Sequence, residues 1–233
     1  SLRASLVFEN DPFSLDVRAG VLDDMKQYGI KTVIDDKMPR DLSDISATLT
    51  KVKALRPDLL ILSGHSKGAA TAARQIKEMQ IQVPIIAMTH CEAAKVISKF
   101  GSSSNGYLCP TQWAETLSYS DNLFGSASTY DLLFKGTYEG YKNVPYQAAQ
   151  ASAAVMVWKD AFERANSFDT AKVRDALAAT NMSTFYGNIK FSSAGNNIAK
   201  PMVLRQIQNG KLNVVAPSKW ASHPVQYPRK VKD

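Results

Sequence analysis

The stretch DLLILSGHSKGAATAARQIKEMQ, residues 58–80, decides how the fold of this chain is predicted. A short apolar run at 59–62 leads through the turn SGHSKG into a helical pattern at 67–80. Such a run, bounded by turn signals, predicts a strand buried on both faces of a sheet. The turn fits G-x-S-x-G, which in serine hydrolases presents the nucleophile between a strand and a helix. It also suits a loop that holds a small ligand, because a helix N-terminus offers free N–H groups.

The same alternation extends outward from this stretch. Strands are predicted at 4–8, 31–38, 58–62, 84–88 and 106–110, and helices at 14–29, 41–57, 67–80 and 92–101. In the second helix Ser43 is the expected N-cap and Pro57 the expected stop. Alternating strands and helices predict an α/β fold, a Rossmann-like parallel sheet flanked by helices on both faces.

The pattern changes after Pro110. A polar, aromatic stretch precedes three helical patterns at 128–141, 145–166 and 169–181, and the alanine-rich middle helix can pack closely against a neighbour. Residues 187–215 indicate strands separated by turns, with a tight turn at QNGK. An interdomain crossing is expected at residues 110–114.

The composition excludes several classes of protein. The chain has 233 residues, 45% of them hydrophobic, and no apolar run reaches the roughly 20 residues of a membrane span. The net charge is +7, but basic residues are interspersed with acidic ones, which favours a solvated surface over a nucleic-acid interface. The N-terminus has no leader pattern. Cys91 and Cys109 lack metal-ligand spacing, and the sequence leaves open whether they are two buried thiols or a disulfide.

The candidate site is expected where parallel strands end. Ligands of such sheets bind outside the carboxyl ends of the strands. The turns there are 9–14, 63–68 and 89–92, with the exit at 111–115. Helices begin just beyond the turns, and Lys67 adds attraction for an anion, so we expect a small polar or carboxylate ligand.

A serine hydrolase is the first alternative. Ser66 would be its nucleophile, with His90 or His223 downstream. However, His90 lies one strand after the turn, which does not fit the order Ser, acid, His, and the earlier loops lack a glycine-rich oxyanion sequence. We therefore expect a binding protein without catalytic residues, cofactor or metal.

Six stretches carry a resemblance to one family: FENDPFSLDVRAGVLDDMKQYGIKTV, DLSDISATLTKVKALRPDLLILSG, AARQIKEMQIQVPIIA, GYLCPTQW, PYQAAQASAAVMVWKDAFERA and VRDALAATNMSTFYGNIKFSSAGNNIAKPMVLRQIQNGKL. In this order they resemble the type I periplasmic solute-binding proteins of branched-chain amino acid ABC transporters. The resemblance implies a non-enzymatic protein, periplasmic or extracellular, that closes two hinged lobes on a solute and delivers it to a membrane permease. It implies no nucleic-acid partner. A ligand-sensing regulatory domain on the same fold is the second alternative, and the sequence shows no signalling or DNA-binding module beside it.

The resemblance also implies a domain plan. Residues 1–112 correspond to lobe two, 113–183 to a helical segment of lobe one, and 184–233 to strands that cross back and a tail. The chain would then be a C-terminal portion that lacks the leader and most of the first lobe. Self-association is expected, because the returning helices lack their usual sheet.

The resemblance places candidate solute contacts on ten residues. Most have a structural alternative: Phe13 as a hydrophobic staple, Ser66 as a helix N-cap, Glu92 in the first turn of a helix, Trp113 in the core and Tyr146 at the surface. The acidic residue that amino-acid binders of the family carry near Thr89 is displaced here, so the expected solute is an amino acid or a small carboxylate, including aromatic ones. The ten candidates are Phe13, Ser63, Gly64, His65, Ser66, Thr89, His90, Glu92, Trp113 and Tyr146.

Overall fold

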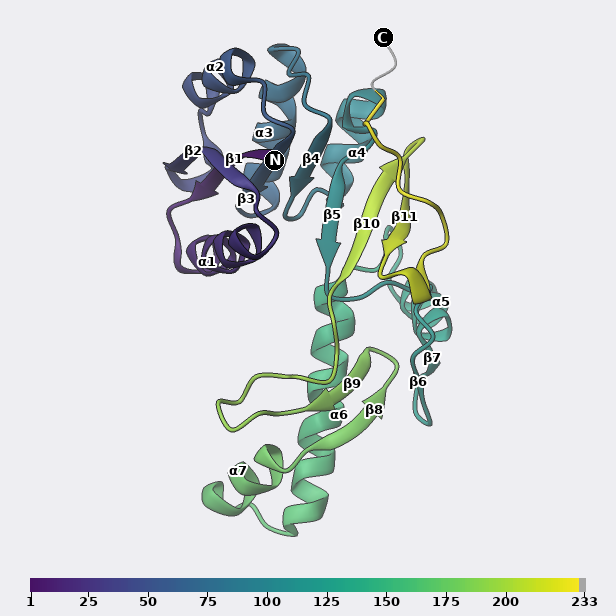
Figure 1. Ribbon diagram of the computed structural model, residues 1–233. Helices are drawn as coiled ribbons and strands as arrows, with labels where there is room; N and C mark the ends of the chain where they lie inside the picture. Colours follow the sequence, from purple (N-terminus) through teal and green to yellow (C-terminus); the bar gives the residue numbers. More distant parts are fainter. Residues whose placement is uncertain (231–233) are drawn as a thin grey trace. The chain divides into compact units, whose positions relative to one another are not determined.

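The computed structural model describes residues 1–230, and the side chains of all of these except 94 and 95. The chain forms two compact units (Figure 1). Unit 1 comprises residues 1–110 and the segment from Leu204 onward, and unit 2 comprises Thr111–Val203.

Unit 1 is built on a seven-stranded, mostly parallel sheet. Its order is β11-β10-β5-β4-β3-β1-β2, and β2, β1, β3, β4 and β5 run parallel to their neighbours. The α/β prediction is confirmed. The strands are β1 (Arg3–Glu9), β2 (Lys31–Met38), β3 (Leu59–Ser63), β4 (Ile85–Met88), β5 (Leu108–Thr111), β10 (Val203–Gln208) and β11 (Lys211–Ala216).

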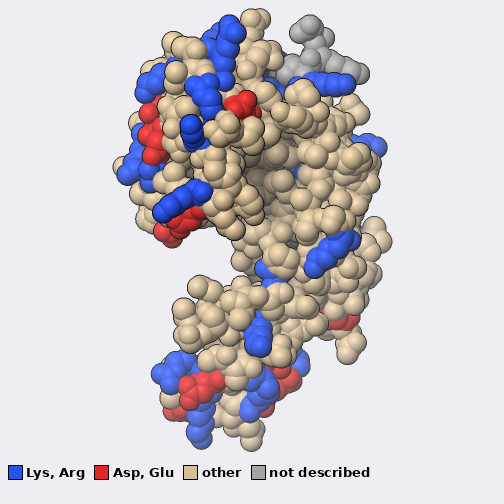
Figure 2. All heavy atoms as spheres, in the orientation of Figure 1, with Lys and Arg blue, Asp and Glu red and all other residues tan. Residues whose placement is uncertain are grey.

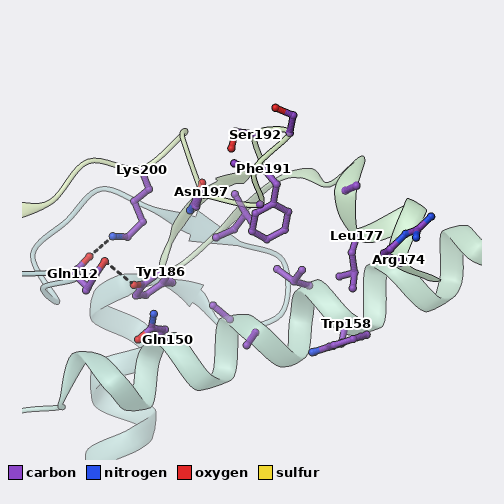
Figure 3. Close-up of a pocket in the computed structure, with 18 residues that line it drawn as sticks. Gln112, Gln150, Trp158, Arg174, Leu177, Tyr186, Phe191, Ser192, Asn197 and Lys200 are labelled. Atoms are coloured by element: carbon purple, nitrogen blue, oxygen red, sulfur yellow. Dashed lines mark hydrogen bonds between the residues drawn. The ribbon is translucent and has the colours of Figure 1, made fainter. Parts of the chain in front are cut away.

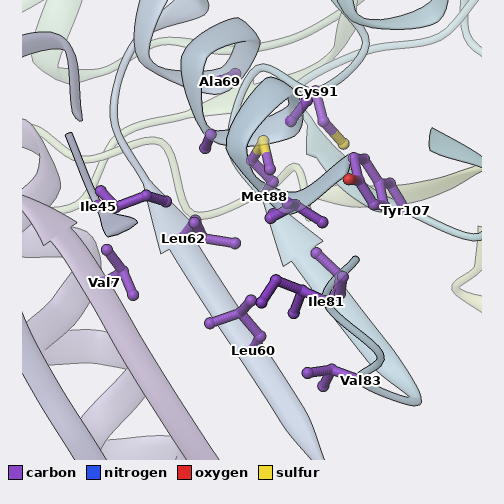
Figure 4. Packing of buried hydrophobic residues seen from close by; sticks show 14 of the residues in the cluster. Val7, Ile45, Leu60, Leu62, Ala69, Ile81, Val83, Met88, Cys91 and Tyr107 are labelled. Carbon is purple, nitrogen blue, oxygen red and sulfur yellow. The ribbon is translucent and has the colours of Figure 1, made fainter. Parts of the chain in front are cut away.

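Helices cover both faces of this sheet, as predicted. On one face α1 (Pro12–Gln27) packs Met25 against Ala4, Leu6 and Phe8 of β1. On the other face the core includes side chains from α2 (Ser46–Leu55), α3 (Ser66–Glu78) and α4 (Ala94–Phe100). Val7 of β1 and Leu60 and Leu62 of β3 point into this second core (Figure 4). Burying each such side chain stabilises the fold by about 1.5–3 kcal/mol.

The start of α2 differs from its prediction. Ser43 does not cap the helix; a short 3-10 turn (Arg40–Leu42) comes first, and α2 begins at Ser46 after Ile45. The reason is a long-range contact, since the Ile45 N–H donates to Gln75 Oε1 of α3 at 2.8 Å. The C-terminal prediction is confirmed, because α2 ends at Leu55, two residues before Pro57.

The last two strands complete the sheet from a distant part of the sequence. In Figure 1, β10 lies beside β5 and runs in the opposite direction. A tight turn at Asn209 and Gly210, both with positive φ, connects β10 to β11, as the QNGK signal predicts. The tail then returns to the sheet, where Gln206 Nε2 donates to Gln226 O at 3.0 Å and Arg229 lies over the Tyr107 ring.

A disulfide joins Cys91 to Cys109 in unit 1. It links the loop after β4 to β5 across a separation of 18 residues, and both cysteines are fully buried. Of the two states that the sequence left open, the structure has the bonded one.

Unit 2 contains three helices and two small hairpins. The helices are α5 (Ala127–Thr137), α6 (Tyr146–Ala165) and α7 (Thr170–Ala178), and the hairpins pair β6 (Ser120–Asp121) with β7 (Gly125–Ser126) and β8 (Asn181–Thr184) with β9 (Gly187–Lys190). Alanines at 149, 153 and 161 are among the buried residues of α6, which confirms the expected close packing of this helix. Besides the 3-10 turn at Arg40–Leu42, unit 1 contains 3-10 turns at Gly101–Ser104 and Ser218–Trp220.

The surface agrees with the expected charge pattern. On the face shown in Figure 2, basic and acidic side chains are interspersed instead of gathering into one positive patch. Among the described helices, none combines the length and the apolar character needed to cross a membrane.

Candidate functional site

Three aromatic rings meet at the carboxyl edge of the unit 1 sheet. Phe13 lies in the first turn of α1, just after β1; His65 follows β3, and His90 follows β4. The Phe13 ring centroid is 5.4 Å from that of His65 and 6.0 Å from that of His90, and the two imidazoles are stacked at 5.9 Å. The three loops are brought together because neighbouring parallel strands end at the same edge. Phe13 and His65 remain exposed enough to contact a solute.

Thr89 holds the loop that carries His65. Its hydroxyl oxygen accepts a hydrogen bond from the Gly64 N–H at 3.0 Å and donates to Gly64 O at 2.8 Å. Ser63 is fully buried, 3.4 Å from the same hydroxyl. Ser63, Gly64 and Thr89 therefore position the loop, and His65 is the residue of this turn that presents a side chain at the edge.

Two carboxylates accompany the rings, which the sequence analysis missed. Glu9 ends β1 with 2% of its surface exposed, and its Oε2 has no hydrogen-bond partner. Asp11 caps α1 by accepting from the Ser14 N–H, and its Oδ1 lies 3.5 Å from His65 Nε2. The sequence signal that could have identified this carboxylate site is the acidic residue that follows the apolar run of β1.

Electrostatics set the charge of this edge. Burial opposes ionisation of Asp11, but the hydrogen bond from Ser14 and the nearby His65 outweigh it and lower the pKa of its carboxyl group. Burial lowers the pKa of His90, and repulsion from His65 lowers it further. Attraction by Glu92 raises this pKa but does not outweigh burial. At neutral pH Asp11 is therefore ionised and His90 is neutral.

One prediction about the turn after β3 is wrong. Ser66 is not the N-cap, since His65 occupies that position and Ser66 is the first helical residue. The reason is that the chain enters helical geometry one residue earlier than the serine signal suggested. Lys67 of the same turn pairs its Nζ with Asp41 at 2.9 Å, and its attraction for an anion stays a prediction.

The geometry also disfavours a catalytic Ser66. In the part of the chain that the structure describes, no hydrogen bond joins its hydroxyl to a histidine, and its φ lies outside the positive range. The strained backbone of a nucleophile elbow is therefore missing at this turn.

Glu92 lies apart from the first turn where one alternative placed it. Helix α4 begins at Ala94, so Glu92 precedes the helix, and its Oε1 is 3.9 Å from Arg205 Nη2. Both side chains are largely buried. Its negative charge is thus balanced by Arg205 of β10.

Two candidates belong to unit 2. Trp113 is 1% exposed; its Nε1–H donates to Phe185 O at 3.2 Å and its ring packs edge-on against Tyr130, so the structure supports the core role. Tyr146 is the first residue of α6. Burial raises the pKa of Tyr186 to about 12, and the nearby Tyr146 adds to this shift.

Unit 2 has a cavity of its own, of about 910 Å³ (Figure 3). Its floor is the apolar face of α6, including Val157 and Trp158. At one end Lys200 donates to Gln112 O and lies 4.5 Å from the Tyr186 ring centre, and burial lowers the pKa of Lys200 to about 8. The cavity is mostly apolar, and the exposed Val155 and Phe168 extend the apolar surface of this unit. Self-association through it stays a prediction.

Comparison with known proteins decides the family. The family model described as periplasmic binding protein matches residues 3–211 of the chain. The chain belongs to this family of periplasmic binding proteins. The recognition made from sequence is confirmed, and members of the family are non-enzymatic binding proteins.

Solved structures of periplasmic binding proteins share the fold. A leucine-binding protein, LivK, from Thermotoga maritima is similar at 23% identity and a TM-score of 0.79, over 92% of this chain and 59% of that one. LivJ from Streptococcus pneumoniae, in complex with isoleucine, has 18% identity and a TM-score of 0.76, over 92% and 60%. A solute-binding protein from R. palustris, in complex with benzoate, has 19% identity and a TM-score of 0.75, over 92% and 57%. This periplasmic binding protein chain spans about three fifths of the length of these structures.

Proposed function

We propose that this protein is the solute-binding component of an ABC importer and that it binds an amino acid or a small carboxylate, including aromatic ones. The observation that carries the proposal is the gathering of Phe13, His65 and His90 within 6.0 Å of one another at the edge of the unit 1 sheet. Their ring faces suit an apolar or aromatic side chain. The family, and the isoleucine and benzoate in two related structures, support this class of solute.

The polar groups suit the charged end of such a solute. Helix α3 begins at this edge without a side-chain cap, and its first-turn N–H groups attract an anion. Asp11 and Glu9 attract a cationic group, so an α-ammonium has acceptors here although Glu92, the carboxylate after β4, lies against Arg205. A second lobe closing over the solute would stabilise the closed state through contacts made only there.

The proposal includes a location outside the cytoplasm and a membrane permease as partner. The Cys91–Cys109 disulfide supports the location, because disulfides persist in oxidising compartments. The permease follows from the family and has no support beyond it.

A ligand screen on the intact protein tests the proposal. Thermal shift identifies stabilising amino acids or aromatic acids, and calorimetry then measures their affinity. We expect His65→Ala to weaken binding at least about tenfold, since it removes one of three contacting rings. We expect Ser66→Ala to bind nearly as the unmodified protein does, and His223→Ala, in the exposed tail, is the control.

Two results would contradict the proposal. An affinity unchanged by His65→Ala would remove this edge from the binding site. Covalent labelling of Ser66 by a fluorophosphonate, lost in Ser66→Ala, would favour the hydrolase instead.

A further inference from the structure

Glu9 carries a buried oxygen that lacks a hydrogen-bond partner. Only 2% of the residue is exposed, and Oε2 receives no hydrogen bond. The carboxylate lies directly against Gly64, where an added Cβ would come within 2.9 Å of Oε2. Burying an unpaired carboxylate is strongly unfavourable, so this position favours a positively charged group beside it.

Asp11 and His65 supply two further donors at the same point. One donor atom from each of Glu9, Asp11 and His65 lies within 4.8 Å of the other two. Asp11 has a second buried oxygen, Oδ2, without a partner. The acidic pair therefore has unused acceptor capacity that faces an imidazole nitrogen.

Two basic side chains of helices α1 and α3 are engaged elsewhere. Lys67 pairs with Asp41 and Arg18 with Asp35. Within residues 1–230, neither Glu9 nor Asp11 forms an ion pair with a lysine or arginine. In this range the one partner of Asp11 that can carry a positive charge is His65. The lysines and arginines within residues 1–230 thus leave this acidic pair uncompensated.

The mixture of donors selects a class of cation. Carboxylates alone suit Mg²⁺ or Ca²⁺, whereas an imidazole added to them suits a first-row transition ion such as Zn²⁺. Donors about 2.0–2.2 Å from a tetrahedral Zn²⁺ lie roughly 3.4 Å apart. The 3.5 Å between His65 Nε2 and Asp11 Oδ1 matches this spacing.

We infer that Glu9, Asp11 and His65 form a binding site for a divalent transition cation, with Zn²⁺ as the representative ion. Half of the His65 side chain is exposed, which gives the ion an entry path. Three protein ligands leave a coordination position open for water or for an oxygen of a solute. The loops after β1 and β3 both supply ligands, so bound metal would also tie them together.

Calorimetric titration of the metal-stripped protein with ZnCl₂ tests the inference, with the visible spectrum of bound Co²⁺ as a second readout. We expect one Zn²⁺ per chain, and affinity reduced at least about tenfold by His65→Ala and by Glu9→Gln. Glu9→Gln keeps the side-chain shape, and His65→Ala changes a half-exposed residue, so both variants should fold. His223→Ala, in the exposed tail, is the matched control and should bind as the unmodified protein does.

Several outcomes would overturn the inference. These are the lack of saturable Zn²⁺ binding, equal affinity in His65→Ala, loss of binding in His223→Ala, or preferential binding of Ca²⁺. The test uses metal alone and is independent of the proposed function. Zn²⁺ binding without any organic solute would support the metal site while contradicting solute binding.

Discussion

Replacing Thr89 by valine tests whether this residue holds the loop that presents His65. The variant keeps the shape of the side chain but removes the hydroxyl that bonds both the N–H and the carbonyl of Gly64. Gly64 is buried, so water does not readily replace these bonds. Each buried group left unpaired costs about 1–3 kcal/mol, and we expect the free energy of unfolding to fall by about 2–4 kcal/mol.

The assay is urea unfolding followed by far-UV circular dichroism. Thr89→Ser is the matched control, because it keeps the hydroxyl and loses one methyl group, which costs about 0.8 kcal/mol. The reasoning is refuted if Thr89→Val unfolds at the urea concentration of the unmodified protein, or if Thr89→Ser is as destabilised as Thr89→Val.

Two further predictions concern stability. Replacing both Cys91 and Cys109 by serine should lower the free energy of unfolding by about 3 kcal/mol, from the 18-residue separation that the disulfide closes; urea midpoints unchanged by the replacement would contradict this. Burial lowers the pKa of Lys200 from 10.5 to about 8, so the unfolded chain binds more protons between these values and stability should rise with pH across that window. The 2.5-unit difference in pKa corresponds to a destabilisation of about 3.4 kcal/mol, which partial solvent screening reduces to roughly 1–2 kcal/mol. Lys200→Met should therefore be more stable than the unmodified protein below pH 8. Thermal melts at pH 7 and pH 10 should show this difference shrinking, and an equal difference at both pH values would refute the argument.

Much of unit 1 could be predicted from sequence because its signals are local. Buried strands such as β3 (Leu59–Ser63) are short, mainly apolar runs, and β3 ends at a turn followed by an amphipathic helix. The turn at Asn209 and Gly210 was equally readable, since both residues tolerate positive φ.

Features set by distant contacts could not be predicted in this way. The start of α2 depends on Gln75, which lies 30 residues beyond Ile45. Likewise, the engagement of Lys67 by Asp41 is invisible in the spacing of either residue.

The candidate site was predicted in part. The structure brings together Phe13, His65 and His90, which the loop positions indicated. The role of Glu9 was missed, because a glutamate at a strand end is normally assumed to reach solvent. Trp113 could be assigned to the core only once Phe185, 72 residues later, was seen to accept its N–H.

The order of strands has a consequence for synthesis on the ribosome. Strand β5 ends at residue 111, but its neighbour β10 begins at residue 203, after the whole of unit 2 has been made. At about 5–20 residues per second, these roughly 90 residues take on the order of 5–20 s. During that interval the nascent chain exposes the unpaired edge of β5, and this is when chaperone capture or strand-mediated aggregation would compete with folding.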